Sequence, residues 1–228
     1  MIKLLYKINL FFSYLKYKIK NFIKPLEINK NLVFIKEYFK NRKTGFYVDV
    51  GCFHPIRFSN TLFLYNKGWS GLNLDLSKKS IDLFNMSRPR DLNLNYGVGN
   101  KNCEMEFYYN KDLFQSNTLN QEFKKYFLKP KGIKKKKIEV KTLDFILKSY
   151  FPNQKIDLLD IDAEGFDYEV LKGINFEETD IELIMIEVHH FNEKTIEKSV
   201  KIRKLLEDEG FILIYGDYPG NCIFKNKN

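Results

Sequence analysis

Residues 45–228 alternate between two hydrophobic patterns. Short continuous apolar runs are typical of buried strands, and they are separated by stretches with apolar residues every three or four positions, which are typical of helices. The predicted strands are 46–50, 71–76, 92–97, 105–109, 138–140, 156–161, 181–188, 211–215 and 221–224. The predicted helices are 61–67, 81–86, 143–150, 168–171 and 196–209.

This order of elements predicts an α/β fold with helices on both faces of a mostly parallel sheet. A turn at 219–221 joins the last two strands into a hairpin, so we expect one antiparallel edge strand. The lysine run Lys134–Lys137 is interpreted as a solvated loop in front of a strand.

The N-terminal segment has a different pattern. On a helical wheel, nine of its apolar side chains fall within an arc of roughly 120°, and all six lysines of residues 1–24 fall outside it. The nine are Leu4, Leu5, Ile8, Phe11, Phe12, Leu15, Ile19, Phe22 and Ile23. Pro25 ends this helix, and a second helix is predicted at 32–41. We therefore divide the chain into a basic amphipathic segment, 1–43, and a globular domain, 44–228.

Two interpretations of the first helix stay open. The lysines exclude a membrane-spanning helix, and lysines on both sides of the apolar run, with no small-residue cleavage site after it, argue against a secretory signal. Residues 1–24 either lie at the surface of an anionic membrane, with their lysines on the headgroups, or pack on the globular domain or on a second subunit.

Composition and charge narrow the class of protein. With 228 residues, 44% of them hydrophobic, the chain can form one sizeable core and is not disordered as a whole. Residues 1–43 hold 11 basic and 2 acidic residues and carry the whole net charge of +9. The neutral remainder argues against nucleic-acid binding. Three widely spaced cysteines exclude a disulfide scaffold and indicate a cytoplasmic protein. If residues 1–24 lie on a membrane, the expected location is its inner face.

Acidic residues gather where the predicted parallel strands end, which is where open α/β sheets bind ligands. They are Asp49, Asp75, Asp160, Asp162, Glu164 and Glu187. Asp75 follows Gly51 by 24 residues, a spacing that suits binding of ribose hydroxyls. Gly51 stands alone, without the G-x-G-x-x-G pattern that seats a pyrophosphate. An acidic rim suits a ligand with a ribose, an amino group and a sulfonium cation, such as S-adenosylmethionine.

Four segments resemble the FkbM family of S-adenosylmethionine-dependent methyltransferases. They read FYVDVGCFHPIRFSNTLFLYNKGWSGLNLDLS, IEVKTLDFIL, IDLLDIDAEGFDYEVLKGINF and IELIMIEVHH. The resemblance covers roughly residues 45–225. It implies a class I methyltransferase fold, which is Rossmann-like with seven strands and a C-terminal hairpin. It also implies O-methylation, commonly of a hydroxyl on a sugar or natural product.

The resemblance also implies roles for the residues that bind the cofactor. Asp49 and Gly51 are expected to face its methionine end, whose carboxylate Ser59 and Asn60 reach. Asp75 is expected to hold the ribose hydroxyls.

The remaining expected roles concern adenine and the methyl acceptor. Tyr96 and Gly97 are expected near adenine, and Asp162 between the cofactor and the acceptor. The segment 107–119 is interpreted as a flap on the acceptor side.

The three histidines, His54, His189 and His190, are all predicted at this rim. Strand alternation puts Glu187 and His189 on the same face. One interpretation is a divalent metal site of Asp162, Glu187 and His189, with His54 nearby, that holds Mn²⁺ or Fe²⁺, or Mg²⁺ if oxygen ligands dominate. The others are a metal-free base and a structural histidine.

The function that we expect is transfer of a methyl group to a hydroxyl of a small-molecule or glycan acceptor. The protein aligns the reacting atoms, and His189 or Asp162, or a metal, activates the hydroxyl. Two alternatives remain. One is a membrane-associated binding module without turnover, and the other is a nicotinamide-dependent nucleotide-sugar enzyme. The missing G-x-G-x-x-G pattern counts against the latter.

Overall fold

The computed structural model describes residues 2–23, 30–189, 192–216 and 218–227, and the strands in these ranges form a seven-stranded and a three-stranded sheet. In spatial order the larger sheet consists of β3 (Leu92–Leu94), β2 (Ser70–Leu74), β1 (Phe46–Val50), β7 (Ile156–Ile161), β8 (Ile181–Glu187), β10 (Asn221–Asn226) and β9 (Phe211–Tyr215). β3, β2, β1, β7 and β8 run parallel, whereas β10 is antiparallel to both of its neighbours. The predicted α/β class with a mostly parallel sheet and a C-terminal hairpin is confirmed. The antiparallel strand lies next to the edge strand β9, not at the edge itself.

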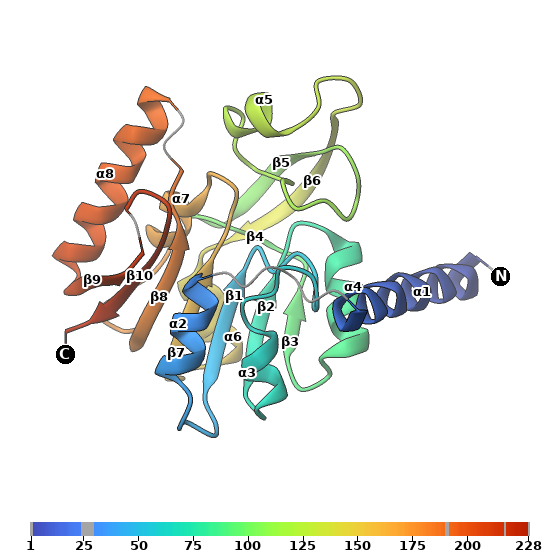
Figure 1. Cartoon of the computed structure of the whole chain (residues 1–228). Helices are drawn as coiled ribbons and strands as arrows, with labels where there is room; N and C mark the ends of the chain where they lie inside the picture. Colours follow the sequence, from blue (N-terminus) through green and yellow to red (C-terminus); the bar gives the residue numbers. More distant parts are fainter. Residues whose placement is uncertain (1, 24–29, 190–191, 217, 228) are drawn as a thin grey trace.

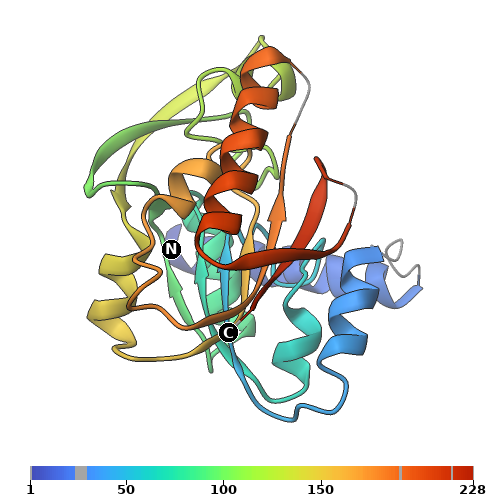
Figure 2. The ribbon, with the colours of Figure 1, turned by 90° about the vertical axis from the view of Figure 1, so that its left-hand side faces the viewer.

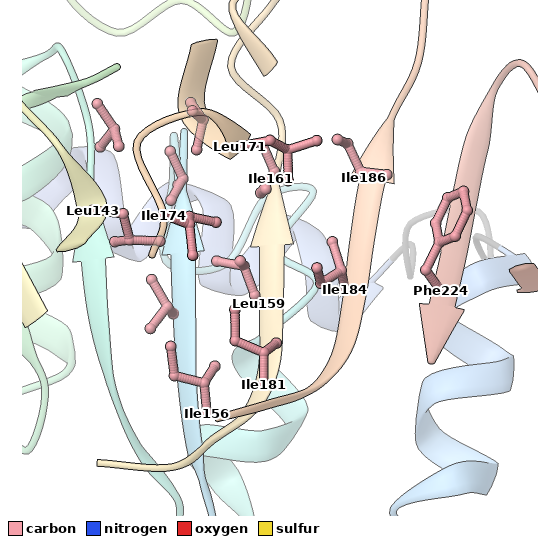
Figure 3. Close-up of a cluster of buried hydrophobic side chains, with 14 of the residues drawn as sticks. Leu143, Ile156, Leu159, Ile161, Leu171, Ile174, Ile181, Ile184, Ile186 and Phe224 are labelled. Atoms are coloured by element: carbon pink, nitrogen blue, oxygen red, sulfur yellow. The ribbon is translucent and has the colours of Figure 1, made fainter. Parts of the chain in front are cut away.

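Helices cover both faces of this sheet (Figures 1 and 2). One face packs against α2 (Lys30–Tyr38), α3 (Leu62–Asn66) and α4 (Lys78–Ser87). The other packs against α6 (Leu143–Tyr150), α7 (Asp167–Leu171) and α8 (Glu193–Asp208). Figure 3 shows the core on this second face, where aliphatic side chains from β7 and β8 meet those of α6 and α7. Burial of these side chains supplies the main stabilisation of the domain.

The smaller sheet has the order β4 (Gly97–Val98), β6 (Lys134–Lys141) and β5 (Cys103–Tyr109), and α5 (Phe123–Phe127) lies between β5 and β6 in sequence. It corrects two predictions. The predicted strand 92–97 splits, because its first part pairs with β2 and Gly97 pairs with β6. The lysine run begins a strand and is not a loop, because Lys135 and Lys137 form ion pairs with glutamates on β5, at 3.0 and 2.6 Å.

The two N-terminal helices have different environments. α2 belongs to the core, where Ile35 and Phe39 are fully buried. α1 (Ile2–Ile23) lies beside α4 and extends past it (Figure 1). Among the described helices, none combines the length and the apolar character needed to span a membrane.

Candidate active site

Two adjoining cavities lie at the carboxyl ends of β1, β2, β7 and β8. The larger has a volume of about 280 Å³ and the smaller about 40 Å³. They share four lining residues, Gly51, Gln115, Asp162 and Glu164. The strand ends that the sequence pointed to therefore form one continuous site.

The turn after β1 brings three strand ends together. Gly51 has a φ of +85°, and a methyl group on its Cα would overlap the carbonyl oxygen of Asp162. The Gly51 N–H donates to the carbonyl of Leu74 at 2.8 Å, and the Asp162 N–H donates to the carbonyl of Val50 at 2.9 Å. Only glycine fits this combination of left-handed backbone and close approach. A ligand in either cavity can thus lie directly against the backbone.

Asp75 lies in the smaller cavity together with Tyr96 and Gly97, the three residues predicted around the nucleoside. Its carboxylate accepts backbone N–H groups of Phe53 at 2.8 Å and Ser77 at 2.6 Å, one on each oxygen. These bonds fix the orientation of the carboxylate while leaving a lone pair on each oxygen for a ligand. Burial raises its pKa to about 6, so it is largely ionised at neutral pH.

The loop between β1 and α3 lines the larger cavity with Ser59 and Asn60. Beneath it, Asp49 on β1 lies beside Asp160 on β7 in the sheet register. The Asn60 amide donates to the Asp160 carboxylate at 3.0 Å, and Thr61 Oγ1 donates to Asp49 at 2.7 Å. The two buried carboxylates thereby hold this loop over the strand ends.

Sequence reasoning missed Arg88, which follows α4 and is almost fully buried. Its guanidinium donates to the carbonyl of Pro55 and to the hydroxyls of Ser59 and Thr61, at 2.7–2.8 Å. A buried arginine with several acceptors is a strong positioning group, so Arg88 fixes the cavity-lining loop. No local pattern distinguishes it from the exposed Arg90 two positions later.

The floor of the larger cavity is strongly acidic. Among the described residues that line it are the five carboxylates Asp49, Asp160, Asp162, Glu164 and Glu187, and none of these lining residues is Lys or Arg. Burial, reinforced by repulsion from Glu187, raises the pKa of Asp162 well above its usual range and that of Glu164 to about 9. The site therefore favours protons, or a positively charged ligand in their place.

His189 faces Glu187 in the same cavity, as strand alternation predicted. Its Nε2 lies 3.6 Å from the Glu187 carboxylate, and its ring packs against Phe123 and Phe127 of α5, with ring centroids 4.9 and 5.8 Å away. No pattern in the sequence predicted α5, which has only five residues. The packing holds the imidazole at the cavity wall.

The structure brings together three possible metal ligands, and this group differs from the predicted one in a single residue. Glu164, Glu187 and His189, rather than Asp162 with the latter two, offer ligand atoms that all lie within 4.8 Å of one another. His54 is not among the described residues that line either cavity. Its Nδ1 accepts the N–H groups of Ile56 and Arg57, both at 3.1 Å, and burial lowers its pKa to about 4. The prediction that His54 lies near a metal is therefore wrong, because its ring nitrogen organises its own loop. His190 lies outside the described residues.

The acidic cluster predicts a pH dependence of folding stability. The folded protein keeps the Glu164 proton up to a pH of about 9, whereas the unfolded chain loses it near pH 4.5. Between these values the folded state binds more protons, so stability falls as the pH rises. We expect the ligand-free protein to melt at lower temperature at pH 9 than at pH 6, and Glu164→Gln to reduce this decrease.

Thermal melts followed by circular dichroism between pH 6 and pH 9 would measure this effect. Glu209→Gln, at an exposed glutamate after α8, is the matched control and should follow the wild-type curve. Identical pH slopes for wild type and Glu164→Gln would contradict the buried, protonated state of this carboxyl group.

The strand order, the Gly51 turn and the carboxylate at the end of β2 agree with the class I methyltransferase fold that the resemblance implied. The family described as "Methyltransferase FkbM domain" matches residues 49–213, and the chain belongs to this family. The family that the sequence motifs resembled is thus confirmed.

Each individual protein that resembles this chain either matches only part of it or shares little sequence identity with it. "Methyltransferase sdnD" from Sordaria araneosa is 36% identical over 90 residues, which cover 35% of this chain and 32% of that protein. The match thus spans about a third of the curated relative. Among solved structures, a TehB-like SAM-dependent methyltransferase from Corynebacterium glutamicum is 12% identical, with a TM-score of 0.46, over 94% of this chain and 97% of that one. A SAM dependent methyltransferase from Aquifex aeolicus is 13% identical, with a TM-score of 0.42, over 91% and 95%.

Proposed function

We propose that this protein is an S-adenosylmethionine-dependent methyltransferase that methylates a hydroxyl oxygen of a carbohydrate or glycoconjugate. The observation that carries the proposal is the larger cavity, which the Glu187–His189 pair lines together with Gly51 and Asp162. A hydroxyl is a poor nucleophile at neutral pH and needs a base beside it. The pair supplies such a base next to the part of the cavity that fits the reactive end of the cofactor.

The residues present fit S-adenosylmethionine. Asp75 has the orientation and the free lone pairs to accept both ribose hydroxyls. Adenine fits beside Tyr96 and Phe166, and the methionine end beside Gly51 and Asn60. The acidic floor complements the two positive charges of the cofactor, its sulfonium and its ammonium group.

The smaller cavity must open for this fit. Its volume of about 40 Å³ is far below the ~300 Å³ at the lower end of small-molecule sites. Phe114, Gln115 and Asn117 line it, and they belong to the segment predicted as an acceptor flap. We infer that this segment moves outward when the nucleoside enters and then covers both ligands.

When bound, the cofactor supplies an electrophilic methyl group and leaves as S-adenosylhomocysteine. The chain aligns the acceptor oxygen with that methyl group, which is mainly a proximity effect. His189 Nε2 takes the hydroxyl proton as the oxygen attacks. The Glu187 carboxylate, 3.6 Å away, stabilises the resulting imidazolium. Glu164 and Glu187 with His189 also form the set that would hold a divalent cation, and in that case the cation would acidify the hydroxyl.

The lining of the larger cavity supports a sugar as the acceptor. The rings of Phe53, Phe58 and Phe127 offer apolar faces for the C–H groups of a sugar. The amides of Asn60 and Gln115 and the carboxylate of Glu187 offer donors and acceptors for its hydroxyls. Such a mixture of rings, amides and acids suits a polyhydroxylated ligand better than a purely apolar one.

Transfer from ¹³C-methyl-labelled cofactor to a panel of monosaccharides, nucleotide sugars and lipid-linked sugars, with peptides and thiols as controls, tests this function. We expect labelled O-methyl sugar in carbon NMR spectra. His189→Gln should lower kcat by about 10²–10⁴ and change S-adenosylhomocysteine affinity little.

Label found only on nitrogen or sulfur would contradict the proposal. Cofactor binding without transfer to any member of the panel would favour the binding module instead. Activity that disappears on chelation and returns with Mn²⁺ would assign the activation of the hydroxyl to a metal.

A further inference from the structure

The first helix is held on the domain by a single face. Leu10 is buried at 6% exposure, Tyr6 donates from its hydroxyl to Asp82 at 2.7 Å, and the Tyr17 ring packs on His54 with centroids 4.6 Å apart. These residues are spaced four and seven positions apart, so they share one side of α1. The contacts fix the helix against α4 and the loop after β1.

The apolar arc of α1 lies on the opposite side. Six of its members have side chains that are 42–63% exposed. They are Leu4, Leu5, Ile8, Phe11, Phe12 and Ile19. Packing of this arc on the globular domain, one of the two interpretations of the sequence, is therefore wrong for these residues. A continuous apolar stripe of this length on a solvent-exposed surface indicates an interaction site.

The charged residues beside the apolar arc indicate what kind of partner this face binds. On the helical wheel, Lys7 and Lys18 lie along one margin of the apolar arc, and Lys16 and Lys20 along the other. No acidic residue occurs before Glu27. Lysines on both margins of an apolar face are typical of helices that lie in the interface of an anionic bilayer. A second copy of the chain fits less well, because docking through this face would bring rows of lysines together.

We propose that α1 docks this protein on an anionic membrane, with its apolar arc in the acyl chains and its lysines on the headgroups. The helix has 22 residues and is about 33 Å long at 1.5 Å per residue. It would lie in the plane of the surface rather than across the bilayer. The tyrosine side would then face the domain, as it does in the structure.

Side-chain contacts also connect α1 with the wall of the larger cavity. The Arg57 guanidinium lies over the rings of Tyr17, Phe53 and Phe58, at 5.7, 6.0 and 4.6 Å from their centroids. Phe53 and Phe58 line the larger cavity. The helix that binds the membrane is thus joined through one arginine to the cavity wall. This favours an acceptor carried on a lipid, a consequence that rests on the proposed function, whereas the docking itself does not.

Co-sedimentation of the full chain with vesicles tests the docking. We expect binding to vesicles of phosphatidylcholine with phosphatidylglycerol, weaker binding at high salt, and weak binding to phosphatidylcholine alone. Phe11→Ser/Phe12→Ser should bind anionic vesicles at least tenfold more weakly. Ile196→Ser/Val200→Ser, which changes two similarly exposed residues of α8, is the matched control and should bind like wild type.

Three outcomes would overturn the proposal. They are equal vesicle binding by wild type and Phe11→Ser/Phe12→Ser, no binding to anionic vesicles, and a wild-type dimer in sedimentation that this variant abolishes. The last would assign the face to a second copy. Circular dichroism shows whether each variant is folded, and titration with S-adenosylhomocysteine shows separately whether it keeps the cofactor site, so loss of docking is distinguished from failure of the proposed function.

Discussion

Asp75→Asn should weaken the binding of S-adenosylhomocysteine by about 10- to 100-fold, which corresponds to the ~1.5–3 kcal/mol of hydrogen bonds to a charged group. The carboxylate is oriented by two backbone N–H groups and lines the smaller cavity together with Tyr96 and Gly97. Asparagine keeps the shape of the side chain but offers one acceptor oxygen instead of two. Isothermal titration calorimetry measures the change.

A surface variant controls for general loss of charge. Asp144→Asn, in the first turn of α6, removes an exposed salt bridge to Lys148 and should leave the affinity unchanged. If Asp75→Asn bound S-adenosylhomocysteine as tightly as Asp144→Asn, then Asp75 would not hold the ribose. The cofactor would then have to bind elsewhere along the strand ends.

Gly51→Ala should destabilise the protein by about 3–5 kcal/mol and abolish cofactor binding. The added methyl group would overlap the carbonyl oxygen of Asp162, which is backbone and cannot move without parting β1 from β7. The positive φ of +85° adds strain of its own. Urea unfolding gives the free energy of unfolding, and titration with S-adenosylhomocysteine gives the loss of binding.

Gly68→Ala separates the effect of the steric overlap from the effect of the backbone strain. Gly68 has a φ of +101°, but no atom lies within 4 Å of an added methyl group. It should therefore cost only the backbone strain of about 1–2 kcal/mol and leave cofactor binding intact. Equal destabilisation by the two substitutions would mean that the close approach of Gly51 to Asp162 has no role in the site.

Several residues that the sequence predicted at the strand ends line the two cavities of the structure. Parallel strands deliver their carboxyl ends to one edge of the sheet, so Gly51, Asp75 and Asp162 could be predicted from hydrophobic runs and the residues after them. The same logic put Glu187 and His189 on one face, where the structure has them. Residues placed by regular geometry are therefore accessible to sequence reasoning.

Residues placed by irregular loops were not accessible in this way. His54 follows the end of β1 by four residues and His189 follows the end of β8 by two, yet the loop of His54 turns its ring toward Tyr17. Arg88 reaches the loop after β1 from a distant position in the chain, and nothing local indicates that it is buried. The lysine run became part of β6 through its antiparallel pairing with β5, where two of its four lysines form ion pairs with glutamates. These outcomes depend on tertiary contacts rather than on local pattern.

The apolar arc of α1 shows the same division. The sequence established that one side of the helix is apolar and free of lysine. It could not establish which side would contact the domain, because tyrosines at the right spacing also pack well. The structure resolves this choice through Tyr6, Leu10 and Tyr17. The apolar side does not pack on the domain, so a partner outside the domain must cover it.

A crystal structure of the protein with S-adenosylhomocysteine tests the central claim most directly, because it locates the cofactor against named residues. We expect the ribose on Asp75, adenine beside Tyr96 and Phe166, and the sulfur between Gly51 and Asp162. The side of the sulfur that carries the methyl group in S-adenosylmethionine should face His189. The flap, which lies within the segment 107–119, should have moved outward relative to the present structure. A nucleoside bound away from Asp75, or a sulfur that does not face the Glu187–His189 cavity, would contradict this account.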